Sequence, residues 1–132
     1  MADVYPIQHA GIFNISTGAA GAPTLQAVLT VAMNSSQVSG HGRLTQATNP
    51  PLDCNNAFNG VVHALGLGKA QQIYSLQGSA IPPLPGATQV TQLLIVLDGI
   101  WGTKGTATYT YLQGSTFHEL TDVPVRVEWL MQ

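Results

Sequence analysis

Residues 24–33 read TLQAVLTVAM, and this stretch decides the fold class. Every second position from Leu25 to Met33 is apolar, whereas Gln26 and Thr30 fall between those positions. Successive side chains of an extended chain point to opposite faces, so this period of two is typical of a half-buried β-strand. The stretch therefore predicts a strand with one face in a core and one in solvent.

The same alternation recurs along the chain, and no segment repeats its apolar residues at helical spacing. We expect one short helical turn, at 55–58. In the C-terminal segment Pro124 predicts an edge or a bulge at the start of a strand, because proline lacks a backbone donor. The further segments that read as strands are 9–15, 37–46, 58–65, 70–77, 89–97, 106–112 and 123–129.

Roughly eight short strands, separated by segments rich in Gly, Pro, Asn and Ser, favour an antiparallel sandwich or barrel. Of the two we predict the sandwich. The chain has 132 residues, the usual size of one domain. The prediction is thus a single all-β domain over residues 1–132, an antiparallel β-sandwich of about eight strands.

Charge is scarce in this chain. Only 8% of residues are charged and the formal net charge is −2, with Thr, Gln, Ser and Asn supplying most of the polar side chains. A chain without a basic excess has no counterion-release drive toward nucleic acid or anionic lipid, so we expect no nucleic-acid partner. The longest apolar run, 93–97, is far too short for a membrane span.

The N-terminus reads MADVYP and lacks the features of a secretion signal, so we expect cytoplasmic synthesis, with export that needs no signal peptide left open. Cys54 is the single cysteine, so it forms no internal disulfide, which agrees with a reducing compartment.

The most distinctive stretch is SGHGRLTQATNPPLD, residues 39–53. Gly40 and Gly42 flank a histidine, and their missing side chains would let another backbone or a ring approach closely. One interpretation of the stretch is a structural loop whose polar side chains cap their own turn. The other is a polar recognition site built by His41, Arg43, Asn49 and Asp53.

The residues that could carry catalysis or bind metal are scattered. The four histidines lack ligand spacing, although His41 and His63 would be neighbours if their strands paired, so we expect no metal and no cofactor. A nucleophilic Cys54 would need a partner that lowers its pKa, which Asp53 does not supply, and we interpret Cys54 as a small apolar filler. Nucleophile-elbow and phosphate-loop motifs are absent. A small hydrolase using His41 with Cys54 or Asp53 is therefore the least favoured function.

Trp101 lies in DGIWGTKG, residues 98–105, between two predicted strands. A loop tryptophan offers a flat apolar face with one donor and is a common platform for a sugar or a protein partner. The alternative is a lid folded over the end of the fold. Trp129 lies in an alternating segment and is expected in the core.

The segment 93–97, LLIVL, is apolar on both faces. A sheet face that cannot enter the core needs a cover, because exposing two or three such side chains forgoes about 1.5–3 kcal/mol each. The cover is either the proline-rich segment 78–87 or a second copy of the protein. We favour the second copy and so predict a homo-oligomer.

Residues 39–53 together with Asn59–Gly60 and GTATYTYL, residues 105–112, resemble a family of small bacterial proteins classed only as a domain of unknown function. The signature is the Gly40-His41-Gly42 run followed by TQATNPP, residues 45–51. The resemblance implies a bacterial origin and a stand-alone domain. It supplies no activity, ligand or catalytic residue.

The function we favour from the sequence is a non-enzymatic binding or assembly module that recognises neutral polar ligands such as glycans. Neutral polar side chains suit hydrogen bonding to uncharged hydroxyls, and a loop aromatic suits stacking on a sugar face. The main alternative is a purely structural, self-assembling protein without a small ligand. The predicted ligand-binding residues are Trp101, His41, Arg43, Asn49 and Asp53.

Overall fold

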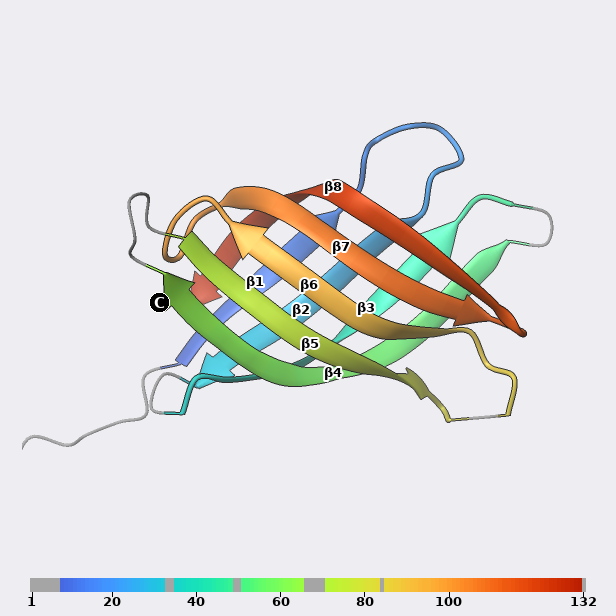
Figure 1. Ribbon diagram of the computed structural model, residues 1–132, viewed down its shortest axis with the longest axis horizontal. Coiled ribbons are helices and arrows are strands. Elements are labelled where there is room, and N and C mark those ends of the chain that lie inside the picture. Colours follow the sequence, from blue (N-terminus) through green and yellow to red (C-terminus); the bar gives the residue numbers. More distant parts are fainter. Residues whose placement is uncertain (1–7, 33–34, 49–50, 66–70, 84, 132) are drawn as a thin grey trace, which may run out of the picture.

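A computed structural model describes residues 8–32, 35–48, 51–65, 71–83 and 85–131 (Figure 1). Eight antiparallel strands account for most of them, which confirms the all-β prediction. The part of the chain that the structure describes contains no helix long and apolar enough to cross a membrane. The strands are β1 (Gln8–Ile15), β2 (Thr24–Ala32), β3 (Gln37–Gln46), β4 (Leu52–Leu65), β5 (Gln71–Ile81), β6 (Gln89–Leu97), β7 (Lys104–Gln113) and β8 (Thr116–Met131).

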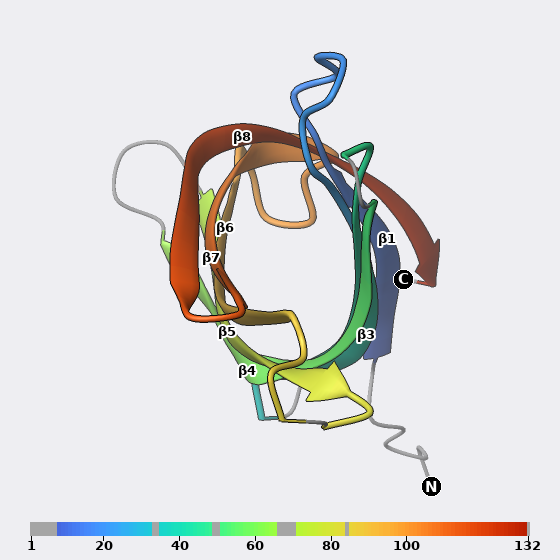
Figure 2. The same ribbon diagram turned by 90° about the vertical axis from the view of Figure 1, so that its right-hand side faces the viewer.

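The strands close into a barrel, so the prediction of a sandwich is wrong. Each strand pairs with its neighbours in sequence, and β1 also pairs with β8, with Phe13 opposite Val127. Viewed from one end the barrel has a flattened outline (Figure 2). Sandwiches and barrels use strands of the same length and alternation, and they differ in whether the first and last strands meet.

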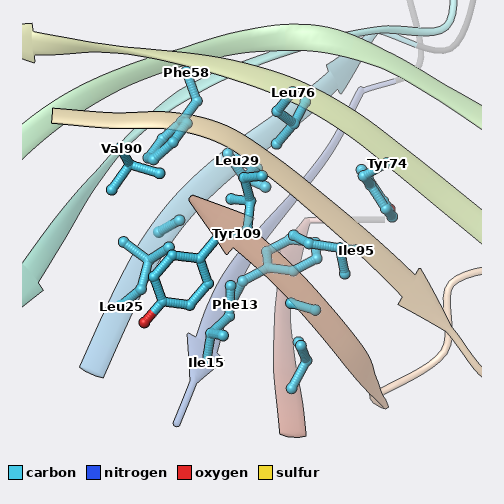
Figure 3. Packing of buried hydrophobic residues seen from close by; sticks show 14 of the residues in the cluster. Phe13, Ile15, Leu25, Leu29, Phe58, Tyr74, Leu76, Val90, Ile95 and Tyr109 are labelled. Carbon is cyan, nitrogen blue, oxygen red and sulfur yellow. The ribbon is translucent and has the colours of Figure 1, made fainter. Parts of the chain in front are cut away.

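Alternation sorts the side chains between the inside and the outside of the barrel. In β2 the positions from Leu25 to Val31 that the sequence assigned to one face are buried. In β6, Leu93, Ile95 and Leu97 are fully buried, whereas Leu94 points outward and is 39% exposed. Aromatic rings fill the middle, where Phe13 meets Tyr74 edge to face with 5.4 Å between ring centroids (Figure 3). The interior is thus a packed core.

Glycines allow the sheet to coil this tightly. A Cβ atom on Gly40 would overlap the backbone oxygen of Val28 on the adjacent strand. A Cβ on Gly42 would lie 2.8 Å from Cε2 of Phe58, because that ring lies over the glycine inside the barrel. Both close approaches were predicted from the sequence, one by a backbone and one by a ring. Strand positions that lack a side chain are where a closed sheet bends most easily.

Several strands extend further than the sequence indicates, β4 and β8 by the most. The segment 55–58, expected as a helical turn, lies within β4. Asn56 interrupts the apolar pattern there but faces inward, fully buried, and its Oδ1 accepts a hydrogen bond of 2.9 Å from the backbone N–H of Val90. That bond satisfies a backbone donor at a point where the pairing of β6 with β7 shifts register.

The last strand does not start at Pro124 but passes through it. The expected bulge lies just before the proline: Ala107 pairs with Val123 and Tyr109 with Leu120, so two residues of β8 oppose one of β7. Asp122 takes a positive φ of 52° within this bulge.

Candidate functional site

The outer face of β2, β3 and β4 carries a row of neutral polar side chains. Thr30 of β2 pairs with Ser39 of β3, which pairs with Asn59 of β4. In the next row, Gln37 of β3 lies between Ala32 and Val61. Together these six residues line a depression of about 390 Å³, which we call the neutral depression.

The polar groups of the neutral depression are free to bind. Within the described residues, the side chains of Thr30, Gln37, Ser39 and Asn59 make no hydrogen bond to the rest of the chain. Gln37, Ser39 and Asn59 are exposed, and no charged side chain lines the depression. The site therefore offers hydroxyl and amide groups, both donors and acceptors, in a surface without charge.

Arg43 and Asp53, two of the sequence-predicted site residues, form an ion pair further along the same outer face. Arg43 donates from Nε to Oδ1 at 2.7 Å and from Nη2 to Oδ2 at 2.6 Å. The hydrogen bonds from Arg43 hold the pKa of the Asp53 carboxyl below its usual range, and the same pairing raises the pKa of Arg43. Each charge is matched by the other, so the pair presents no net charge to a ligand.

His41 is exposed on the outer face of β3, between the neutral depression and the ion pair. Its partners across the sheet are Val28 and Ala57, so it does not neighbour His63, which pairs with Ile73. Among the described residues, no group of three or more His, Cys, Asp or Glu side chains is placed to hold a metal ion.

Cys54 is half-buried and packs against the core opposite Leu44, on the side of β4 that faces away from His41. Burial raises the pKa of its thiol, which opposes formation of the thiolate at neutral pH. The structure thus does not assemble a nucleophile from Cys54 and His41. Asn49, the remaining residue predicted beside them, lies outside the described residues.

Trp101 lies at the other end of the barrel, away from the ion pair. It is half-buried, packs against the core cluster, and stacks on His9 with 3.7 Å between ring centroids and 8° between ring planes. Trp129 contacts it edge on at 5.2 Å. Figure 2 shows the orange segment between β6 and β7 within the outline of the barrel. Of the two alternatives drawn from the sequence, this placement corresponds to the lid.

The backbone at Trp101 is in the left-handed region, with φ of +57°, which residues other than glycine rarely adopt. Such a conformation costs of order 1–3 kcal/mol and persists only where the surroundings impose it. Here the backbone N–H of Trp101 donates to Oε1 of the buried Gln72 at 3.2 Å. Sequence reasoning missed Gln72, because a glutamine in a strand gives no sign of facing inward.

The row of Thr30, Ser39 and Asn59 was missed as well. The alternation places Ser39 on the same face as His41. Thr30, Ser39 and Asn59 lie side by side only because of the register of three strands, which the alternation does not give.

A protein-family model described as a domain of unknown function (DUF1842) matches residues 5–117. The match extends from β1 into the start of β8. It confirms the resemblance to a domain of unknown function, whereas the bacterial origin and the signature in residues 39–53 stay predictions. No curated protein matches this chain.

Proposed function

The chain belongs to the family of the domain of unknown function DUF1842, and we propose that it is a non-enzymatic binding module that recognises neutral polar ligands such as glycans. The observation that carries the proposal is the neutral depression, whose polar side chains have no hydrogen-bond partner among the described residues. Uncharged hydroxyl groups of a ligand can both donate to and accept from such side chains.

Charge and shape support a neutral ligand over an ionic one. No charged side chain lines the depression, and Arg43 is already paired with Asp53. Ala32 and Val61 add a small apolar surface beside the polar row. A shallow site with hydroxyls, amides and two aliphatic side chains matches the alternation of hydroxyl and C–H groups on a sugar ring. His41, exposed on the same face, adds a further donor or acceptor at the border of the depression.

A panel of neutral oligosaccharides, titrated by NMR, tests the proposal. We expect the largest shifts at Ser39 and Asn59, and the double variant Ser39→Ala/Asn59→Ala should weaken binding by about tenfold or more, since two hydrogen bonds of about 1 kcal/mol each are lost. The control is Gln92→Ala/Thr106→Ala, which removes one exposed amide and one exposed hydroxyl from the outer faces of β6 and β7, away from the depression. Equal losses in both variants, or no binding of any neutral glycan, would contradict the proposal.

Self-assembly is a second candidate function, supported by an apolar strip on the outer face of β5 and β6. Ile73 pairs with Val96 across the two strands, and Leu94 follows on the same face. Leu94 is 39% exposed, so the described part of the segment 78–87 does not cover it fully; Leu84, which that interpretation needed, lies outside the described residues. Within the described residues the outer positions that flank the strip on β5 and β7, Ser75, Thr106 and Thr108, are uncharged. The nearest charges, Asp98 and Lys104, are of opposite sign and lie beyond the end of the strip, so little charge repulsion opposes its pairing with the same strip of a second copy.

A further inference from the structure

A small pocket of about 120 Å³ lies at the end of the barrel where Trp101 packs. Its walls come from the ends of β2 and β4, from Ser36 between β2 and β3, from the first residues of β5, and from the loop that joins β6 to β7, on the left in Figure 1. Val31, Val62 and Ile100 make the pocket largely apolar, and the indole of Trp101 adds an aromatic wall. The neutral depression shares none of these residues, so the two sites are separate.

The wall formed by Trp101 is held in place by contacts on several sides. His9 stacks against the indole, and Trp129, beside it, donates from Nε1 to the backbone oxygen of Gly102 at 3.0 Å. The loop is closed by the backbone N–H of Asp98, which donates to Lys104 O at 3.0 Å, and by that of Val127, which donates to Thr103 O at 2.8 Å. A wall fixed in this way loses little conformational freedom when a ligand binds.

One buried polar side chain, Gln72, also lines the pocket. It is 3% exposed, and its Oε1 accepts hydrogen bonds from the Tyr74 hydroxyl at 2.9 Å and from the Trp101 backbone at 3.2 Å. These two donors fix the orientation of the carboxamide, with Oε1 as the occupied atom. The Nε2 amide makes no hydrogen bond within the described part of the chain. Gln72 therefore presents to an apolar pocket an N–H donor that no protein atom occupies, where the acceptor of a ligand can take the place of water.

From these features we infer that the pocket binds a neutral, ring-sized apolar molecule bearing one hydrogen-bond acceptor, which Gln72 recognises through Nε2. The volume is comparable with the apolar cavity of about 150 Å³ that holds one benzene molecule. The ring packs against Trp101 and the aliphatic walls, and the acceptor atom lies toward Gln72. No charged side chain lines the pocket, so an ionised ligand would lose its hydration without compensation.

Three probes of similar size test this inference: benzonitrile, which carries an acceptor, toluene, which carries none, and benzoate, which is charged. Binding is followed by the NMR signals of the Trp101 indole and the Gln72 side-chain amide. We expect benzonitrile to bind about fivefold more tightly than toluene, the effect of one net hydrogen bond, and benzoate to leave both signals unchanged. The inference is wrong if none of the probes shifts these signals up to its solubility limit, or if benzoate binds as well as benzonitrile.

Two variants test separately the contributions of the apolar walls and of the amide donor to binding. Ala64→Leu adds bulk at the mouth of the pocket and should abolish binding of both neutral probes, whereas Ala87→Leu, the same change beside a depression at the opposite end of the barrel, should not. Gln72→Met keeps the length of the side chain but has no N–H donor, so toluene should still bind and the preference for benzonitrile over toluene should disappear. Binding that survives Ala64→Leu unchanged would place the probes elsewhere and overturn the inference. These probes do not contact the neutral depression. A negative result with them would therefore say nothing about the proposed binding of glycans, which has its own test.

Discussion

The indole of Trp101 lies flat against the imidazole of His9, and Trp129 meets both rings edge on, at 5.2 Å and 6.3 Å between centroids. These three residues come from the loop between β6 and β7, from β1 and from β8, so the cluster joins the strands that close the barrel to the loop that covers its end.

We therefore expect Trp101→Ala to lower the free energy of unfolding by about 2 kcal/mol, measured by urea denaturation, because it removes both burial and ring contacts. Phe117→Ala is the control, since Phe117 is 65% exposed and its loss should change stability by no more than about 0.5 kcal/mol. Equal effects of the two changes would show that the cluster contributes nothing to stability. Acrylamide should quench Trp101 and Trp129 to a similar extent, because both are half-buried.

The contact between Gly42 and Phe58 predicts a specific pair effect. Gly42→Ala places a methyl group 2.8 Å from the ring and should destabilise the protein by about 1–3 kcal/mol. Adding Phe58→Leu should remove the clash, so the double variant should be more stable than the sum of the two single changes predicts. Gly99→Ala, where a Cβ meets no atom within 4 Å, is the control. Strict additivity in the thermodynamic cycle would refute the contact.

The ion pair predicts how acid acts on the outer face. Because Arg43 lowers the pKa of Asp53 in the folded protein, the pair stabilises the fold above the ordinary aspartate pKa of about 3.9, and this contribution is lost as pH falls through the lowered value. Carboxyl NMR titration should show Asp53 ionising below the usual range, and Arg43→Gln should raise its pKa. Since both side chains are exposed, 1 M salt should also raise it by screening. A midpoint that neither change moves would rule out the pairing.

The apolar strip on β5 and β6 predicts an assembly that one surface charge disrupts. Leu94→Glu should yield a smaller species that keeps its β-sheet spectrum, measured by light scattering and circular dichroism, because Leu94 points outward. Ile95→Glu is the contrasting variant: Ile95 is fully buried, so the same charge one residue further should unfold the barrel. An unmodified protein that is monomeric at high concentration would exclude this assembly.

The positions of most strands could be predicted because a strand buried on one face has apolar residues at every second position. That alternation can be recognised within a short stretch of sequence. Closure was not predictable from such stretches, since it depends on β1 meeting β8 across nearly the whole chain. The N-terminal part of β4 was missed for a local reason. Asn56 faces the core, and its compatibility with burial rests on the backbone of Val90, more than thirty positions away.

The candidate site, like the fold, could be predicted only in part. The structure places His41, Arg43 and Asp53 on one outer face, because they lie close together in sequence on paired strands, and their role in recognition stays a prediction. Trp101 does not join them, and the polar row from Thr30 to Asn59 is visible only when the register of three strands is known. Residues near in sequence could thus be related to one another, and residues from distant strands could not.

Pairing of β1 with β8 also has a consequence for how the protein is made. Phe13 finds its partner in Val127, so a nascent chain can build one hairpin after another on the ribosome but cannot seal the sheet until the last strand has been translated. Until then the edges of β1 and of the newest strand present unpaired backbone groups, which attract other chains. Contacts this distant in sequence also form slowly. The interval between translation of β1 and arrival of β8 is therefore when the polypeptide most needs protection from aggregation.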